Sequence, residues 1–171
     1  MASQAAAVDI AEGIKDKIAS FDLSEEDYTL ERSYADWDLE LKDMDGFELS
    51  DDEKLRVDVV IHTTQQEAEL ATRGTVQFNV PLDVAIRRKF GRDKQDETTG
   101  RIAVEYIDQL MLFTQEMHLE LTKLRMVSEE ELRGIWQSTT LLANPVRQHL
   151  RELRQFTSII RILFRADVAL G

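Results

Sequence analysis

The strongest fold signal in the chain is the stretch VQFNVPLDVAI at residues 76–86. Every second side chain in it is apolar, which is the pattern of a β-strand with one buried face. At about 3.3 Å per residue the strand would extend roughly 35 Å, which is long for a small domain. We therefore expect it to organise the sheet, with one face formed by Val76, Phe78, Val80, Leu82, Val84 and Ile86.

Two features restrict the surroundings of this strand. Pro81 has no N–H to donate to a neighbouring strand, so it predicts a bulge or a sheet edge at that point. The basic run Arg87, Arg88 and Lys89 follows directly after the last apolar position. Because the strand is longer than a small isolated sheet needs, we expect this end to project and to carry positive charge toward a neighbouring molecule.

The chain before this strand is predicted to form a helix and two strands. Residues 8–18 repeat apolar side chains near the helical period, with charged side chains on the other face. Residues 28–34 alternate as a half-buried strand would, and residues 55–61 show the same pattern more clearly. Residues 63–74 are polar and are expected to link the second strand to the long one.

A long helix is predicted after the strand. Residues 91–100 are polar and are interpreted as a hinge. Residues 100–125 then carry an apolar stripe at helical spacing, and Thr98 or Thr99 is expected to cap the helix.

The last part of the chain predicts short elements and a final strand. Residues 128–131 have the form of a capping box and could start a short turn of helix. Alternatively, residues 132–136 belong to an irregular link. Residues 138–143 predict a short strand, and residues 146–153 predict a short helix or a loop. Residues 156–165 alternate again and predict the final strand.

These elements predict a single α+β domain over residues 1–171. Strand runs flanked by helices favour an antiparallel or mixed sheet of about four to five strands, with an N-terminal helix and a long central helix packed on it. The apolar fraction of 43% is that of a globular chain. No run approaches the roughly 18 apolar residues of a membrane helix, and residues 1–9 lack the pattern of a secretory signal.

The charge of the chain is strongly negative and uneven. The net charge is −12, with 20 acids and 6 bases in residues 1–70 but 13 acids and 15 bases in residues 71–171. A chain this acidic is a poor general binder of nucleic acid, because such binding depends on neutralising phosphates. The asymmetry suggests one acidic and one weakly basic surface, although an acidic surface that only confers solubility is the alternative reading.

One stretch, residues 36–53, concentrates the negative charge, and we call it the acidic segment. It holds nine acids and one lysine. It is too polar for a core and too apolar for a simple linker, so we expect a long, partly irregular loop that folds onto the domain or onto a partner. Its interleaved apolar residues are Trp37, Leu39, Leu41, Met44, Phe47 and Leu49.

The residue types that carry catalysis form no recognisable pattern. The chain has no cysteine, which excludes disulfides, zinc–thiolate sites, iron–sulfur clusters and a cysteine nucleophile. His62, His118 and His149 lie in different predicted elements without a second ligand at helical spacing, so each is interpreted as a structural or surface residue. There is no glycine-rich phosphate loop and no nucleophile elbow. We predict no enzyme activity, no metal and no cofactor.

A calcium loop can be tested directly at residues 43–46, which read DMDG. With Gly46 at the sixth position of a twelve-residue loop, the first position is Leu41 and the twelfth is Asp52. Calcium loops need an acidic first residue and a bidentate glutamate at the end, so the match fails.

A second basic group consists of Arg147, Arg151 and Arg154. At helical spacing these three would share one face. The functional interpretation is that they dock onto an acidic surface, such as the acidic segment of a neighbouring subunit. The alternative is a solvated rim without a partner.

Three parts of the sequence share the pattern and phrases of one known protein family. The first is VDIAEGIKDKIASFDLSEEDYTLERSYADWDLELKD at residues 8–43. The second is the pair LRVDVVIHTT at residues 55–64 and ATRGTVQFNVPLDVAIRRKF at residues 71–90. The third is LRQFTSIIRILFRAD at residues 153–167. In these parts the chain resembles the tail terminator (tail completion) family of tailed-bacteriophage neck proteins. The resemblance covers most of the chain and includes no catalytic signature.

The resemblance implies a structural role in the virion. A tail terminator is a small α+β subunit that forms a ring, commonly a hexamer, on the head-proximal end of the tail tube. Its expected partners are copies of itself, the tail tube protein and the head-side connector, with no membrane contact. Genomic DNA would pass through the lumen without sequence-specific binding. Alternatives are another head–tail connector component, of the head-closure or tail-tube-like kind, or an acidic cytosolic protein-binding module.

The residues fit this implication in two physical respects. A closed ring of identical subunits needs two unlike, complementary faces on each subunit, and the two differently charged halves of the chain could supply them. An acidic lumen would also let DNA slide, because it neutralises no phosphate. The candidate subunit or lumen contacts are Asp36, Asp38, Asp43, Asp45, Asp51, Asp52, Arg87, Arg88, Lys89, Arg147, Arg151 and Arg154.

Overall fold

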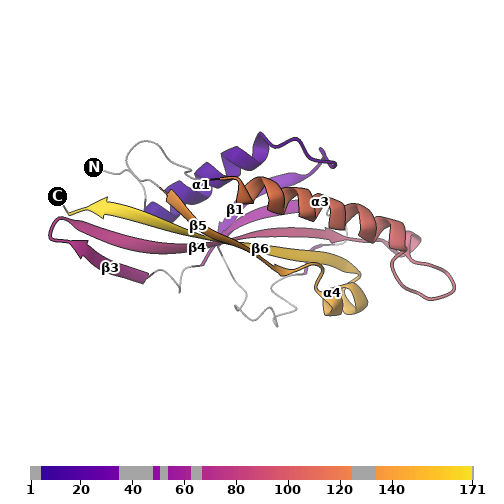
Figure 1. Cartoon of the computed structure of the whole chain (residues 1–171). Coiled ribbons are helices and arrows are strands. Elements are labelled where there is room, and N and C mark those ends of the chain that lie inside the picture. Colours follow the sequence, from indigo (N-terminus) through magenta and orange to yellow (C-terminus); the bar gives the residue numbers. More distant parts are fainter. Residues whose placement is uncertain (1–4, 35–47, 51–53, 63–66, 125–133, 171) are drawn as a thin grey trace.

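The computed structural model describes residues 5–34, 48–50, 54–62, 67–124 and 134–170. In this part of the chain the fold is α+β with a mixed sheet, as the sequence predicts (Figure 1). Five strands lie side by side in the order β1-β2-β4-β6-β5, and a sixth, β3, pairs with β4 outside this path. β1 and β2 run parallel, and every other pair is antiparallel. The strands are β1 (Thr29–Tyr34), β2 (Arg56–Ile61), β3 (Glu67–Thr72), β4 (Thr75–Lys89), β5 (Gly134–Ala143) and β6 (Gln155–Ala169).

The centre of the sheet is the long strand β4, which contains the stretch that alternates in sequence. It pairs with β6 over its whole length, from Thr75 opposite Ala169 to Lys89 opposite Gln155. The register has no break, so the bulge considered for Pro81 is absent on this side. On the other edge β2 pairs only as far as Leu82 and β3 starts only at Asn79. Pro81 therefore lies opposite the gap between two strands, where its missing N–H interrupts no ladder.

β3 corrects the prediction of a polar link at residues 63–74. Glu67–Thr72 is a strand that joins β4 through a two-residue turn at Arg73 and Gly74. In its sequence, EAELAT, the only apolar side chains are Ala68, Leu70 and Ala71, and Ala71 breaks the alternation by which strands are recognised. The strand forms because the edge of the long β4 is available for pairing, which is a tertiary effect.

β5 and β6 are both longer than predicted. The alternation predicted strands at residues 138–143 and 156–165, whereas β5 begins at Gly134 and β6 extends to Ala169. The pairing of β5 with β6 shifts register twice, between Trp136 and Ser138 and between Leu141 and Ala143. Each shift disturbs the period of two, which hides the full length of β5 in the sequence. The capping box predicted at residues 128–131 lies outside the described residues.

Two helices cover the sheet face that carries Val80, Leu82, Val84 and Ile86, which we call the first face (Figure 1). They are α1 (Ala6–Ala19) and α3 (Val104–Thr122). α3 begins later than predicted, and its N-cap is Ala103. Thr98 and Thr99 do not cap it, because they lie before the N-cap position. They belong to a turn in which their backbone N–H groups donate to the Asp96 carboxylate at 2.8 and 3.0 Å. A preceding 3₁₀ turn, η1, spans Arg92–Lys94.

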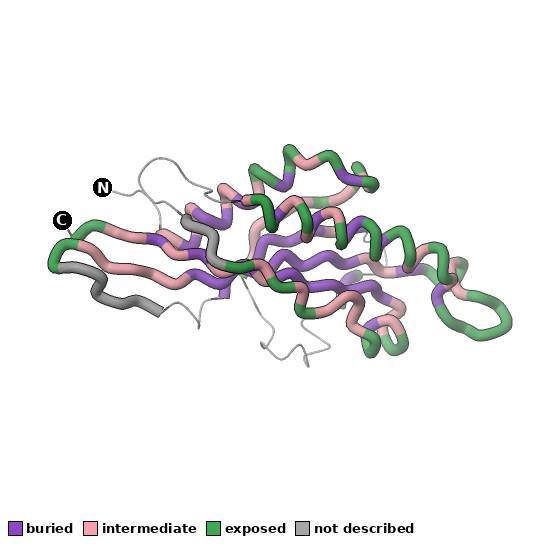
Figure 2. Tube along the Cα trace, in the orientation of Figure 1, coloured by how far each residue is buried: buried purple, intermediate pink, exposed green. Residues whose placement is uncertain are grey.

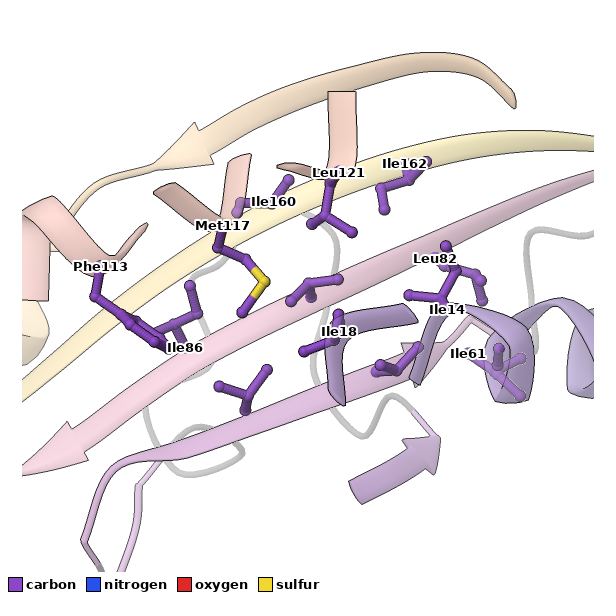
Figure 3. Close-up of a cluster of buried hydrophobic side chains, with 14 of the residues drawn as sticks. Ile14, Ile18, Ile61, Leu82, Ile86, Phe113, Met117, Leu121, Ile160 and Ile162 are labelled. Atoms are coloured by element: carbon purple, nitrogen blue, oxygen red, sulfur yellow. The ribbon is translucent and has the colours of Figure 1, made fainter. Parts of the chain in front are cut away.

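The hydrophobic core lies between these helices and the first face. Figure 3 shows Ile14 and Ile18 of α1 and Phe113, Met117 and Leu121 of α3 converging on the sheet. Their sheet partners are Ile61, Leu82, Ile86, Ile160 and Ile162. The opposite face, which we call the second face, carries the odd-numbered residues of β4 and β6, and the short helix α4 (Arg147–Glu152) packs against it (Figure 1).

The two ends of β4 differ in burial. Residues 75–79 are half-buried (Figure 2), and together with β3 and the last residues of β6 they extend beyond α1 (Figure 1). The residues from Val80 to Arg87 are buried. The end of β4 that projects beyond the helix-covered part of the sheet is therefore the Thr75 end. The prediction that the Arg87–Lys89 end projects is wrong.

Candidate functional site

The basic end of β4 is held by ion pairs within the chain. Arg87 is almost completely buried, and its Nη2 donates to Asp58 Oδ2 of β2 at 2.7 Å. Arg56 donates to the same carboxylate through Nε at 2.8 Å and to Glu31 of β1 through Nη2 at 2.6 Å. A carboxylate buried between two guanidinium groups receives charge-assisted hydrogen bonds from both. Arg87 is therefore a cross-link between strands and not a surface contact.

Lys89 and Arg88, the other two residues of the basic run, also contact side chains of the same chain. Lys89 Nζ donates to Glu48 Oε1 at 2.6 Å, with the lysine side chain only 8% exposed. Arg88 lies over the ring of Phe90, 5.2 Å from its centroid. Two of the three charges are thus used inside the chain, because strand pairing brings acidic residues of other elements against them.

The acidic segment touches the domain at its described part, residues 48–50. Besides the ion pair of Glu48, Leu49 is buried and its N–H donates to Gln155 Oε1 at 2.8 Å. Gln155 lies opposite Lys89 in the register, so these contacts are on the second face. This fits the prediction that part of the segment folds onto the domain. The six predicted contact residues Asp36, Asp38, Asp43, Asp45, Asp51 and Asp52 lie outside the described residues.

A second buried charge cluster is centred on Asp83 of β4. Arg161 of β6 donates to it through Nε and Nη2 at 2.8 and 2.9 Å, and His62 Nε2 lies 2.6 Å from Asp83 Oδ2. Burial raises the pKa of Asp83, but the hydrogen bonds and charges of His62 and Arg161 outweigh it and hold the pKa below its ordinary value. The cluster joins β4, β6 and the end of β2.

The His62–Asp83 pair has the form of the base and orienting acid of a catalytic triad. Both side chains are buried, and within the described ranges no hydroxyl group is hydrogen-bonded to His62. The geometry therefore supports the interpretation of His62 as a structural residue. Sequence reasoning missed four residues of these clusters, Asp83, Arg161, Asp58 and Arg56. The available signal was a single acid among the apolar residues of each strand, Asp58 in β2 and Asp83 in β4.

His149 attaches α4 to the second face of the sheet. It is fully buried, and its Nδ1 lies 2.8 Å from Thr157 Oγ1 of β6. Burial lowers the pKa of His149, the nearby charge of Arg87 lowers it further, and Glu152 opposes the shift. The neutral imidazole is therefore the form that holds α4 in place. His118, the third histidine, is half-buried on α3.

An open pocket of about 380 Å³ lies between the start of α3, the preceding loop and α4. Its nine lining residues include Arg101, Arg147 and Arg151 and no acid. In the part of the chain that the structure describes, these three arginines form no ion pair. The prediction that Arg147 and Arg151 act together on one surface fits this placement. Arg101 was missed because only the fold brings it to α4.

Arg154 departs from the predicted group. α4 ends at Glu152, and Arg154 follows the C-cap Leu153 with a φ of 52°. Helical spacing therefore does not place it on one face with Arg147 and Arg151, and that prediction is wrong for this residue. Its carbonyl accepts the N–H of Phe90 at 2.9 Å, so its backbone closes the end of the β4–β6 pair.

The solvent side of α3 is unexpectedly apolar. Val104, Leu112 and Leu119 are 70%, 50% and 54% exposed, and Met111 is also exposed. At 100° per residue these four positions fall within one sector of about 100°, opposite the buried stripe of the helix. We call this sector the α3 outer stripe. Three polar residues, Asp108, Gln115 and Thr122, share this sector, but four large apolar side chains exposed on one side of a surface helix make the stripe a candidate contact surface.

The described residues offer neither a metal site nor a membrane-spanning helix. No three His, Asp or Glu side chains among them are grouped so that they could hold a metal ion. No helix among the described elements is both long and apolar enough to cross a bilayer. Neither a protein-family model nor a curated protein matches this sequence.

Proposed function

We propose that this chain is a structural subunit of the neck of a tailed bacteriophage, of the tail terminator kind. In this role it forms a ring, commonly of six copies, that caps the tail tube and joins it to the head-side connector. The small α+β fold, with α1 and α3 on the first face of a mixed sheet, agrees with what the sequence resemblance implies. The role is structural and needs no cofactor.

The observation that carries the proposal is the contrast between one apolar, basic surface and a strongly acidic N-terminal part of the same chain. The α3 outer stripe and the three arginines of the pocket form an apolar and basic surface. Residues 1–70, with 20 acids and 6 bases, supply an acidic counterpart. Rings of identical subunits are built from such heterologous contacts.

The buried polar clusters support a structural role over a catalytic one. Asp58 and Asp83 are fully buried, and each is bound by cationic or hydrogen-bonding side chains of its own and neighbouring elements. Such clusters fix strand register, because their carboxylates are held inside the sheet by these partners. The surfaces that remain open are the ones suited to protein contacts.

Electron microscopy of particles produced without this protein tests the proposal. A tail terminator stops tube growth, so we expect tails of abnormal length that carry no head. Tails of normal length that fail to join heads would instead support a joining role for another connector component. Particles indistinguishable from the wild type would contradict both and favour a cytosolic binding module. Supplying the intact protein from a plasmid should restore normal particles.

A further inference from the structure

The α3 outer stripe and the arginine pocket are parts of one continuous surface. Val104 belongs to both, since it is the most exposed residue of the stripe and lines the pocket beside Arg101 and Arg147. The pocket adds further apolar lining from Ile107 and Leu150. The combined surface is thus a largely apolar track along the helix, interrupted by the exposed Asp108 and Gln115, with three positive charges at its N-terminal end.

The occupant of this surface must combine apolar side chains with negative charge. Exposed apolar groups are covered by apolar groups, and arginines without ion-pair partners are matched by carboxylates. This chain contains such a stretch in residues 36–47 of the acidic segment. That stretch holds five acids and one base, with Trp37, Leu39, Leu41, Met44 and Phe47 between them.

The described residues on either side of this stretch place its ends away from the α3 outer stripe. Tyr34 ends β1, the edge strand of the sheet, and Glu48 is bound to Lys89 on the second face. α3 covers the first face, and its outer stripe points away from the sheet. A second copy of the chain can offer the same stretch without these constraints.

We propose that the α3 outer stripe and the arginine pocket of one copy bind residues 36–47 of a second copy. The apolar side chains of that stretch cover Leu112 and Leu119, and its carboxylates reach Arg101, Arg147 and Arg151. The contact is heterologous, because the two surfaces differ, so each copy can bind two neighbours. This inference rests on the proposed function, for which it names the contacts between subunits.

Site-directed cross-linking tests the contact, because the chain has no cysteine of its own. Gln115→Cys lies within the α3 outer stripe and leaves its apolar residues intact, and Lys42→Cys leaves every acid of the acidic segment intact. The two single variants are mixed at high concentration and oxidised mildly. We expect a disulfide-linked heterodimer joining positions 42 and 115, identified by peptide mass.

The matched control uses Arg73→Cys, in the exposed β3–β4 turn, instead of Gln115→Cys. Its yield with Lys42→Cys should be at the level of random collision. Equal yields for the two pairs, or no heterodimer with Gln115→Cys, would overturn the inference. A chain carrying both Lys42→Cys and Gln115→Cys that cross-links only within itself would also overturn it, because the occupant would then be the chain's own segment.

Charge reversal tests the contribution of the pocket. Arg151→Glu should lower the yield of the heterodimer about 2- to 5-fold, as expected for one solvent-exposed ion pair. Arg73→Glu makes the same charge change outside the surface and should have no effect; equal effects of the two would count against the pocket. Circular dichroism establishes that each variant is folded.

The outcomes separate this inference from the proposed function. Failed cross-linking together with tails of abnormal length would overturn this surface and leave the neck role intact. Successful cross-linking together with unaffected particles would support the contact between copies and remove the neck role.

Discussion

Single residues on the second face of the sheet connect strands through charge. Asp58 and Asp83 lie on adjacent strands; Arg56 and Arg87 bind Asp58, and Arg161 and His62 bind Asp83. Removing a carboxylate from water is costly, and the cost is offset only when partners surround it. Such clusters favour one register, because a shift by one residue would move each acid away from its partner and onto the apolar face.

Asp83→Asn tests this role at the scale of one residue. The substitution keeps the shape of the side chain but removes the charge that Arg161 and His62 contact. Breaking a buried ion pair in this way costs about 3–5 kcal/mol, so we expect a large drop in the free energy of unfolding measured in urea. Asp27→Asn is the control, since Asp27 is 90% exposed and 3.8 Å from Lys54, and it should leave the urea midpoint nearly unchanged. Similar midpoint shifts in both variants would contradict the interpretation.

At the scale of elements, α4 depends on a neutral histidine. The pKa of His149 is lowered in the folded state, so the unfolded chain binds a proton at this site first as the pH falls. Stability from this contact is therefore complete above the ordinary histidine value of about 6.5 and declines below it. The lowered pKa of Asp83 acts in the same direction, but only below the ordinary aspartate value of about 3.9.

Urea unfolding at a series of pH values checks this dependence. His149→Asn retains an amide nitrogen near the position of Nδ1 but cannot titrate. We expect its stability to fall less steeply than that of the wild type as the pH decreases from about 6.5. His118→Asn, in the half-buried position on α3, should retain the wild-type slope. A wild-type slope in His149→Asn would show that another group carries the effect.

The elements also show what the sequence could predict. The alternation of β4 and the helical period of α1 are local signals, and both elements were predicted. β3 was missed because its strand character comes from pairing with β4 and not from its own side chains. The spacing of Arg147 and Arg151 predicted a shared surface, whereas Arg101 joins it only through the fold. The acids predicted to contact subunits lie outside the described residues, so their role stays a prediction.

At the scale of the whole molecule, the uneven charge makes the proposed contact between copies sensitive to salt. In the proposed contact, carboxylates of one copy would meet the exposed arginines that line the pocket of another, and dissolved ions would screen this attraction. The screening length falls from about 10 Å at 0.1 M to about 3 Å at 1 M ionic strength. We expect the cross-link between positions 42 and 115 to form less at high salt, measured as dimer yield on a gel. A yield that rises with sodium chloride would indicate a contact governed by the apolar stripe alone.

The pairing of β4 with β6 has a consequence for how the chain reaches this fold. Lys89 meets Gln155 and Thr75 meets Ala169, so the central ladder joins segments more than sixty positions apart. Contacts between distant segments close large loops and form slowly, whereas the β3–β4 hairpin needs only a two-residue turn. On the ribosome the hairpin can therefore form early. The edge of β4 that pairs with β6 stays unpaired until β6 has been synthesised. During that interval the nascent chain exposes the segment most prone to pair with other chains, and prompt capture of β6 protects it.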